Sequence, residues 1–286
     1  MKTATRTFSF ELGPPRTPEA AAKLPAVIAR LAEMKPDFFS VTYGAGGSTQ
    51  EGTYETIMAV VRNTGTEAAP HLTCVGSTRA HVAAHLARYR EAGVRRIVAL
   101  RGDLPATAMS PAAPGDFHYA SELVRFIRAE HGDWFRIAVA AYPEMHPQAP
   151  SPAQDFTHFC RKVEAGADAA LTQLFYNADA YFEFMDRCAG AGIAIPVVPG
   201  IMPITSYANT VRFCAGCGAD LPRWVRLRLE ELDGDKQALA DFGIGVVTRL
   251  CKTLLQGGAP GLHFYTINQT GPALRLWRNL GLGARS

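Results

Sequence analysis

Short apolar runs alternate with longer amphipathic stretches along the whole chain of 286 residues. The apolar runs are rich in β-branched and aromatic residues and are followed by Gly, Pro or polar residues, a pattern typical of buried strands. Strands are predicted at residues 8–12, 37–43, 70–75, 95–103, 136–142, 169–175, 195–200 and 261–268. Helices are predicted between them, and Thr17–Pro18 and Ser151–Pro152 are two of their start signals.

Eight strands, each followed by a helical segment, favour a parallel (β/α)8 barrel of the TIM type, which needs about 250 residues. We therefore predict an α/β fold with a single barrel domain over residues 1–286. Helical segments fill about 205–256, which is longer than one crossover requires. An open doubly wound sheet is the alternative. The glycines at 44–47 lack the GxGxxG spacing of a dinucleotide-binding turn, so they are interpreted as a turn after the second strand.

Composition excludes several classes of protein. Hydrophobic residues make up 48% and charged residues 19% of the chain, as in a globular protein. A net charge of +3 suits a small anionic ligand and gives no basis for nucleic-acid binding. No apolar run reaches the ~20 residues of a membrane span, and the first residues lack the apolar core of a secretory signal.

The six cysteines fall within predicted strands and helices, which predicts reduced thiols and a cytoplasmic location. Cys214 and Cys217 form a CxxC pair without a second ligand pair, so we predict a structural or incidental role for them. No resident metal is expected.

Polar residues collect where the predicted strands end, and in a barrel these ends form the active site. The fourth strand ends in Arg101, Gly102 and Asp103, where an Arg and an Asp on a rigid strand end can clamp an anion and bind a polar partner. A simple ion pair beside a turn glycine is the alternative. The other predicted ends carry Glu11, Thr42, Tyr43, His71, Tyr142, Glu144, His146, Gln173 and Asn268.

These residue types restrict the chemistry. No strand end carries the Lys of a Schiff-base aldolase, and the first strand lacks the paired His of metal-dependent hydrolases. A carboxyl group in an apolar pocket has a raised pKa and can act as a general acid, which makes Glu11 a candidate. Aromatic residues beside an anion clamp suit a planar anionic cofactor, which indicates a redox or group-transfer enzyme. A minor alternative is a metal site built from Glu11, His71, Asp103 and His146.

Several motifs along nearly the whole chain resemble those of the bacterial methylenetetrahydrofolate reductases. They are Phe10-Glu-Leu-Gly-Pro-Pro15, Ser40-Val-Thr-Tyr-Gly44, Ala69-Pro-His-Leu-Thr-Cys74, Ala99-Leu-Arg-Gly-Asp103, Ala140-Ala-Tyr-Pro-Glu144 with His146-Pro147, Thr172-Gln173, Pro199-Gly-Ile201 and His263-Phe-Tyr-Thr-Ile-Asn268.

This resemblance implies an FAD-containing barrel that reduces methylenetetrahydrofolate to methyltetrahydrofolate with NADH for methionine synthesis, and a homo-oligomer. It implies that Glu11 is the general acid that protonates the folate nitrogen as the methylene bridge opens. Asp103 would lie beside the flavin ring and tune it, Gln173 would bind the folate, and Phe213 would stack on the nicotinamide nucleotide. The FAD contacts implied are Thr42, Tyr43, Ala45, His71, Arg101, Gly102, Asp103, Ala120, Tyr142, His146, Ala149, Asp155, Arg161 and Lys162.

The chain departs from the family pattern at five positions. Leu12 and Gly13 replace two Phe of the first motif, and His158 stands where an Asn among the FAD contacts is usual. Asn209 replaces a folate-binding Gln, and Gln269 replaces an Arg, which removes a charge. The donor, NADH or NADPH, has no sequence signature here. An alternative function is that of a related FAD barrel acting on another cyclic amine or imine, and a second alternative is a flavin-binding protein without activity.

Overall fold

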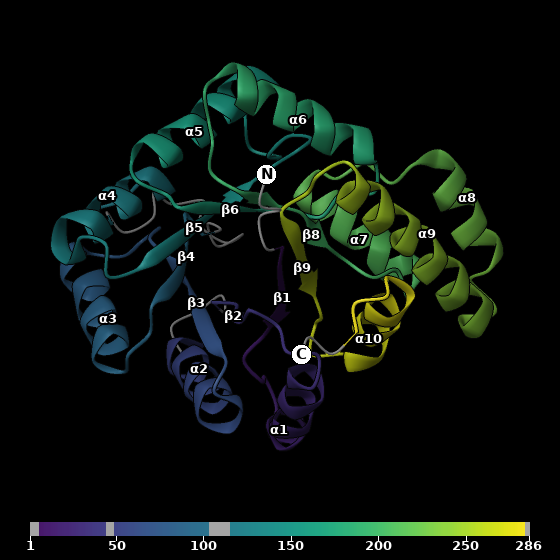
Figure 1. The fold of residues 1–286 in the computed structure, drawn as a ribbon, viewed down its shortest axis with the longest axis horizontal. Coiled ribbons are helices and arrows are strands. Elements are labelled where there is room, and N and C mark those ends of the chain that lie inside the picture. The colour runs from purple at the N-terminus through teal and green to yellow at the C-terminus, as the bar shows by residue number, and fades with distance from the viewer. Residues whose placement is uncertain (1–5, 44–48, 103–114, 284–286) are drawn as a thin grey trace.

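The computed structural model describes residues 6–43, 49–102 and 115–283, and it has the predicted barrel architecture (Figure 1). The helices surround a central sheet whose neighbouring strands are all parallel. The strands are β1 (Thr7–Leu12), β2 (Phe38–Val41), β3 (Glu67–Thr73), β4 (Arg96–Leu100), β5 (Arg136–Ala141), β6 (Ala169–Thr172), β7 (Val197–Val198), β8 (Gly200–Ile201) and β9 (Gly261–Tyr265). The helices are α1 (Pro18–Ala32), α2 (Thr49–Thr64), α3 (Arg79–Glu91), α4 (Ala120–His131), α5 (Pro152–Glu164), α6 (Ala178–Gly190), α7 (Tyr207–Cys217), α8 (Arg223–Glu231), α9 (Lys236–Gln256) and α10 (Thr270–Asn279).

Helix starts agree with their sequence signals. The Thr17 hydroxyl accepts a hydrogen bond from the backbone N–H of Ala20, and Ser151 accepts one from Gln154 in the same way. Both caps satisfy a backbone donor that the first helical turn leaves without a partner. Several strand bounds differ from the prediction. β4, β6 and β9 end at Leu100, Thr172 and Tyr265, three residues before their predicted ends at 103, 175 and 268, so the polar residues there follow the strands. β3 begins at Glu67 rather than Pro70, which places His71 in the second half of its strand.

The predicted seventh strand is divided at Pro199, so the described part of the chain has nine short strands instead of the predicted eight. Proline has no N–H for a ladder bond, so the strand is interrupted there. Before the interruption β7 pairs with β6, and after it β8 pairs with β9. The Pro199 carbonyl accepts a hydrogen bond from the His263 N–H at 2.8 Å. The ring of strands therefore closes through this divided strand.

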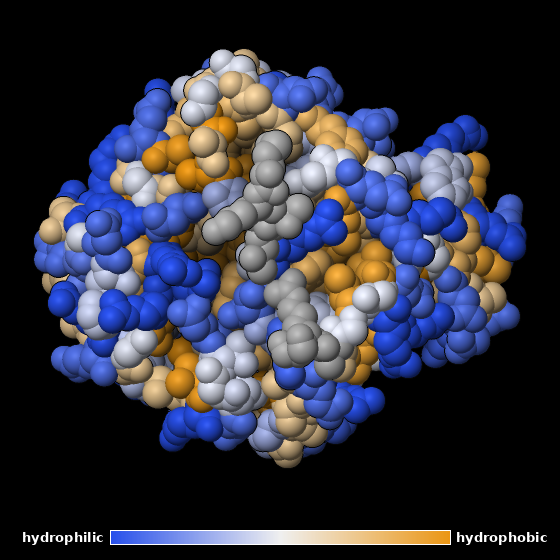
Figure 2. Space-filling model, viewed as in Figure 1, coloured by the Kyte–Doolittle hydropathy of each residue, from blue (hydrophilic) through white to orange (hydrophobic). Residues whose placement is uncertain are grey.

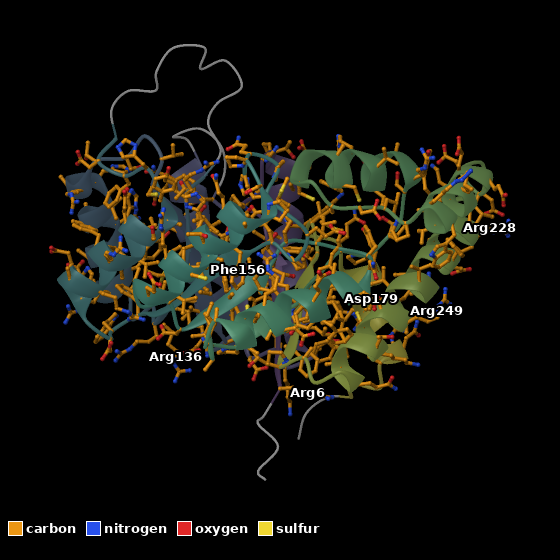
Figure 3. The ribbon with its side chains drawn as sticks, turned by 90° about the horizontal axis from the view of Figure 1, so that it is seen from above. Arg6, Arg136, Phe156, Asp179, Arg228 and Arg249 are labelled. Atoms are coloured by element: carbon orange, nitrogen blue, oxygen red, sulfur yellow. The ribbon has the colours of Figure 1, made fainter. Side chains whose placement is uncertain are left out.

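The strands all begin at one end of the barrel. In Figure 3, Arg6 and Arg136, beside the first residues of β1 and β5, lie at the lower edge. The carboxyl ends of the strands, which carry most of the candidate residues, therefore face the opposite edge. The predicted helical segment at 205–256 forms α7, α8 and α9, and α8 lies outermost, packed on α7 and α9 (Figure 1).

Closure of the ring requires glycine at position 200. The Gly200 N–H donates to the Thr172 hydroxyl at 2.9 Å. A Cβ atom at Gly200 would lie 2.2 Å from the Thr172 carbonyl oxygen and 2.6 Å from the Tyr265 hydroxyl. Neither atom can move without opening the contact between β6 and β9.

We expect Gly200→Ala to lower the free energy of unfolding by about 2 kcal/mol or more, because the added methyl group overlaps backbone atoms. Urea unfolding followed by circular dichroism measures this. The matched control is Gly190→Ala at the end of α6, where a Cβ atom meets nothing within 4 Å. An equal loss of stability in both variants would contradict the close approach at Gly200.

Candidate active site

Alternation along the strands decides which side chains enter the barrel. Phe8 and Phe10 of β1 turn outward and pack on Trp277 of α10, with ring centroids 5.6 and 5.4 Å apart. Because successive strand residues point to opposite faces, Ser9 and Glu11 turn into the barrel. In β9, Phe264 packs on the same Trp277, so its neighbours His263 and Tyr265 also face inward.

The barrel interior changes from apolar to polar along the strands. Its apolar part is a cluster formed by Phe38, Ala69, Val98, Leu171 and Val198. Two residues later on the same inward face, three strands carry a polar side chain instead: Ser40, His71 and Gln173. The interior of the barrel is therefore filled by apolar side chains in its middle layer, and hydrogen-bonding side chains lie nearer the carboxyl ends of the strands.

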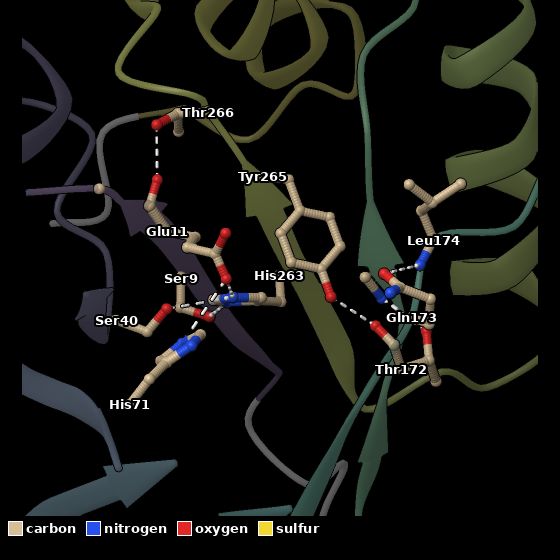
Figure 4. A network of polar contacts seen from close by, with 12 residues as sticks. Ser9, Glu11, Ser40, His71, Thr172, Gln173, Leu174, His263, Tyr265 and Thr266 are labelled. Atoms are coloured by element: carbon tan, nitrogen blue, oxygen red, sulfur yellow. Dashed lines mark hydrogen bonds and ion pairs between the residues drawn. The ribbon is translucent and has the colours of Figure 1, made fainter. Parts of the chain in front are cut away.

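Glu11 lies between two histidines in this polar layer (Figure 4). Its Oε2 atom is 3.5 Å from Nε2 of His71 and 3.8 Å from Nε2 of His263. His263 is fully buried and makes contacts at both ring nitrogens, with the Ser9 hydroxyl at 2.7 Å and the Ser40 hydroxyl at 3.3 Å. The Glu11 side chain keeps 18% of its surface exposed, so a ligand can reach it.

His71 is uncharged at neutral pH. Burial lowers the pKa of His71 to about 4. The nearby Glu11 opposes this shift, and His263 adds to it. The contact between Glu11 and His71 is therefore not an ion pair at pH 7. Nε2 of His71 is buried and makes no hydrogen bond to the described residues. A buried polar atom without a partner is rare, and a ligand that fills the barrel mouth would satisfy it.

Tyr265 and Gln173 extend the network across the barrel (Figure 4). The Tyr265 hydroxyl donates to the Thr172 carbonyl at 2.6 Å, and burial raises the pKa of Tyr265 well above its usual value. Gln173 accepts a hydrogen bond from the Leu174 N–H at 2.9 Å through its side-chain oxygen. Within the described residues its amide NH2 group has no protein partner, so it can donate to a ligand.

The segment after β1 is braced despite its departures from the family motif. Leu12 is buried, and the Gly13 N–H donates to the side-chain oxygen of Asn268 at 2.9 Å. The Asn268 side-chain amide donates back to the Gly13 carbonyl at 2.9 Å. In addition, the Thr266 hydroxyl donates to the Glu11 carbonyl at 2.5 Å. Hydrogen bonds from two side chains that follow β9 to the backbone of Glu11 and Gly13 thus fix the exit of the strand that carries Glu11.

The predicted FAD residues after β5 lie close to one another. The rings of Tyr142 and His146 meet edge to face at 4.6 Å. Asp155 accepts a hydrogen bond from the His146 N–H at 3.0 Å, and Ala149 donates to the His146 carbonyl. Arg101, at the end of β4, donates to Gln148 in the same loop. This group is therefore connected across two neighbouring strand ends.

The two predicted cations on α5 lie in different surroundings. Lys162 donates from Nζ to the Ala140 carbonyl of β5 at 2.5 Å, and burial lowers its pKa to about 8. Arg161 is exposed. Both belong to the last turn of α5.

The remaining predicted contacts follow other strand ends. Thr42 and Tyr43 come directly after β2, and the Tyr43 hydroxyl contacts Gln50. Gly102 has φ of +88°, and a Cβ there would press on Thr73 and Val75 at 3.0 Å. Two further features belong to the same end of the barrel: Ala120 opens α4, and His158 stacks on Tyr119 at 5.0 Å. Ala45 and Asp103 lie outside the described residues.

A pocket beside this network collects residues that are distant in sequence. Asn209 and Phe213 of α7, together with Gln269 before α10, line it along with Tyr265. Sequence reasoning singled out the first three separately and missed His263 and Tyr265. The signal that could have found these two is the alternation of His263, Phe264 and Tyr265, which repeats the pattern of Ser9, Phe10 and Glu11 in the paired strand.

No group of three or more His, Cys, Asp or Glu residues arranged to hold a metal ion occurs within the described ranges 6–43, 49–102 and 115–283. Cys214 and Cys217 both lie on α7, and the Cys217 thiol approaches the Cys214 carbonyl at 3.8 Å. Burial raises the pKa of both thiols, that of Cys214 to about 12. Neither thiol is therefore activated at neutral pH.

Known proteins resemble this chain over nearly its whole length. The family model described as methylenetetrahydrofolate reductase matches residues 1–281. The 5,10-methylenetetrahydrofolate reductases of Salmonella typhimurium and Escherichia coli are each 39% identical over 274 residues, which cover 96% of this chain and 90% of each relative. The methylenetetrahydrofolate reductase (NADH) 1 of Zea mays is 36% identical and covers 96% of this chain, which spans 48% of that longer protein.

A solved structure has a similar fold. It is a Clostridium thermocellum protein described as binding two copies of 5-methyl-5,6,7,8-tetrahydrofolic acid, with a TM-score of 0.65. The alignment covers 99% of this chain and 95% of that one, at 13% identity. At this identity the likeness shows the fold alone.

The buried His71 makes stability depend on pH. The pKa of His71 is about 4 in the folded chain, against 6.5 for an ordinary imidazole, so the unfolded chain binds the proton first as the pH falls. We expect acidification from pH 6.5 to pH 4 to remove roughly 3 kcal/mol through this residue, and His71→Gln to flatten that slope. Urea unfolding at several pH values measures it. The control is His118→Gln at an exposed position, and identical slopes for the wild type and His71→Gln would contradict the argument.

Proposed function

The chain belongs to the methylenetetrahydrofolate reductase family, and we propose that it reduces 5,10-methylenetetrahydrofolate to 5-methyltetrahydrofolate with NADH as donor and FAD as cofactor. The product would supply methyl groups for methionine synthesis. The observation that carries the proposal is the reachable carboxyl group of Glu11 at the barrel mouth, flanked by His71 and His263.

Glu11 would act as the proton donor to the folate nitrogen while the methylene bridge opens. His71 and His263 lie 3.5 and 3.8 Å from its Oε2 atom and would frame the carboxyl group at the barrel mouth. Gln173 would orient the folate with its side-chain NH2 group. The Tyr265 hydroxyl donates its hydrogen bond to the Thr172 carbonyl, so Tyr265 would line the site and would not act as the proton donor.

The described residues fit an FAD at the same mouth. His71 offers a buried Nε2 atom without a protein hydrogen bond in the described part of the chain, and Gly102 lets the backbone turn tightly at the end of β4. Tyr142 and His146 would hold the cofactor from β5, and Arg101 with Lys162 would supply positive charge for its phosphates. Bound FAD would supply the hydride for the folate and take it from NADH. Asp103 and Ala45 remain expected contacts outside the described residues.

The compartment and the membrane question rest on separate observations. All six cysteines are free thiols, which supports the proposal of a reducing, cytoplasmic compartment. None of the helices in the described ranges combines the length and apolar character that crossing a bilayer requires.

We also propose that the protein forms a homo-oligomer through α8. Trp224 and Leu227 of this helix are 55% and 41% exposed, and Figure 2 shows apolar atoms at the surface over α8, at the right. Arg223 and Arg226 lie in the first half of the helix, whereas in its last turn Arg228 is paired with Glu231 and Glu230 remains as the other acidic residue. Two copies related by a twofold axis would pair the helices antiparallel, which sets basic starts against acidic ends.

The proposed function is tested by anaerobic stopped-flow absorbance of the flavin. We expect NADH to reduce the flavin of the wild-type protein and methylenetetrahydrofolate to reoxidise it. Glu11→Gln should keep bound flavin and its reduction by NADH but lose at least about 100-fold in reoxidation by folate, because general acid catalysis contributes on that scale. The control is Glu33→Gln at an exposed position at the end of α1.

Two outcomes would contradict these assignments. Folate reoxidation within a few-fold of wild type in Glu11→Gln would remove Glu11 as the acid. Wild-type flavin that NADH reduces and folate does not reoxidise would favour the alternative, an FAD barrel acting on another cyclic amine or imine.

For the oligomer, we expect Leu227→Glu to shift the molar mass measured by light scattering after size exclusion to a smaller species, because it places charge in an apolar contact. Ala84→Glu, at an exposed position of α3, is the control and should leave the mass unchanged. A wild-type monomer, or a Leu227→Glu variant with the wild-type mass, would refute the α8 interface.

A further inference from the structure

The pocket beside the Glu11 network contains one charged side chain. It lies between α7, the end of β9 and the start of α10. The lining residues that matter here are Asn209, Arg212, Phe213, Tyr265, Thr266 and Gln269. Among them Arg212 alone carries a charge, so an anion that enters the pocket has this cation as its partner.

Arg212 is held at the rim by its own helix. One guanidinium nitrogen donates to the Asn209 side-chain oxygen at 3.1 Å, almost one turn earlier on α7. The guanidinium carbon lies 5.4 Å from the ring centroid of Phe213. The side chain is exposed, and no carboxylate lies within ion-pair distance of it among the described residues. Its charge is therefore oriented and available.

The pocket shares two lining residues with the network around Glu11. Tyr265 belongs both to the pocket and to the network across the barrel. Thr266 belongs to the pocket and donates to the Glu11 carbonyl at 2.5 Å. A ligand whose reacting end lies at Glu11 would pass beside Tyr265 to reach Arg212.

From the Glu11 site outward, the pocket offers first aromatic side chains and then a cation, and a folate carries the matching groups in the same order. Tyr265 and Phe213 offer aromatic surface next to the reaction site, and Arg212 offers a cation beyond them. A folate carries an aromatic aminobenzoyl ring next to its pterin, followed by the carboxylates of its glutamyl tail. Gln269 lines the same pocket and can donate a hydrogen bond, but it has no charge to pair with a carboxylate.

We infer that Arg212, oriented by Asn209, is the residue that binds the carboxylates of the folate glutamyl tail. This inference rests on the proposed function and names a specificity-determining residue for it. The dinucleotide donor is also anionic, because it carries phosphates. The reduction of the flavin by NADH and its reoxidation by the folate are measured separately, so an effect on one ligand can be distinguished from an effect on the other.

The test is steady-state and stopped-flow kinetics of the flavin-loaded enzyme carrying Arg212→Gln. We expect the KM for methylenetetrahydrofolate to rise about tenfold with kcat unchanged, because a charge-assisted contact at an accessible site is lost. Reduction of the flavin by NADH should be unaffected. The matched control is Arg249→Gln on α9, which removes the same charge at an exposed position outside the pocket.

A second substrate isolates the tail. For methylenetetrahydropteroate, which lacks the glutamyl group, we expect wild type and Arg212→Gln to have the same KM. An equal KM rise with and without the tail would overturn the assignment, as would a defect confined to the NADH half-reaction or a rise of the same size in Arg249→Gln. Failure of wild-type reduced flavin to react with folate would overturn the proposed function as well, whereas a normal wild type with an unchanged Arg212→Gln variant would overturn this inference alone.

Discussion

Closure of the barrel depends on the close approach of β6, β8 and β9 around Gly200. The missing side chain lets the Gly200 N–H reach the Thr172 hydroxyl and lets the Tyr265 hydroxyl reach the Thr172 carbonyl. Pro199 divides the strand at this point, so that its first half pairs with β6 and its second half with β9. The same contact fixes β9, and with it His263 and Tyr265, against β1 and Glu11. The position of the candidate acid is therefore a consequence of how the ring closes.

The residues around Glu11 differ in charge and in hydrogen bonding. Burial keeps His71 neutral, and His263 is engaged with the hydroxyls of Ser9 and Ser40. Glu11 thus faces hydrogen-bonding imidazoles, while the Arg and Lys groups proposed for the anionic ligands lie at the strand ends and on α5 and α7. The groups proposed to bind phosphates or carboxylates thus belong to other elements than β1, the strand that carries Glu11.

Local patterns were sufficient to predict most of the elements. Strand alternation, the caps at Thr17 and Ser151 and the repeated order of strand and helix all predict features that the structure confirms. The division at Pro199 was not predicted, because it depends on pairing with two partners, β6 and β9, that the local sequence does not specify. His263 and Tyr265 were missed for a related reason. In β9 alone they look like core residues, and only the register with β1 brings them to Glu11.

The departures from the family motif fall on residues with different structural support. Gly13 lacks the side chain usual at its position, yet a reciprocal pair of hydrogen bonds with Asn268 braces its backbone. Rigid strands therefore carry the acid and its neighbours, and the change at Gly13 leaves that support in place. Asn209 and Gln269, in contrast, lie on or beside helices that line an open pocket. Both residues lie outside the strands, so changes at these positions leave the strand pairing around Glu11 in place. A chain can thus keep its proton donor fixed while the residues that bind the distal end of its substrate change. In this chain the uncharged Gln269 precedes α10, and the cation proposed to bind the substrate tail is Arg212 on α7.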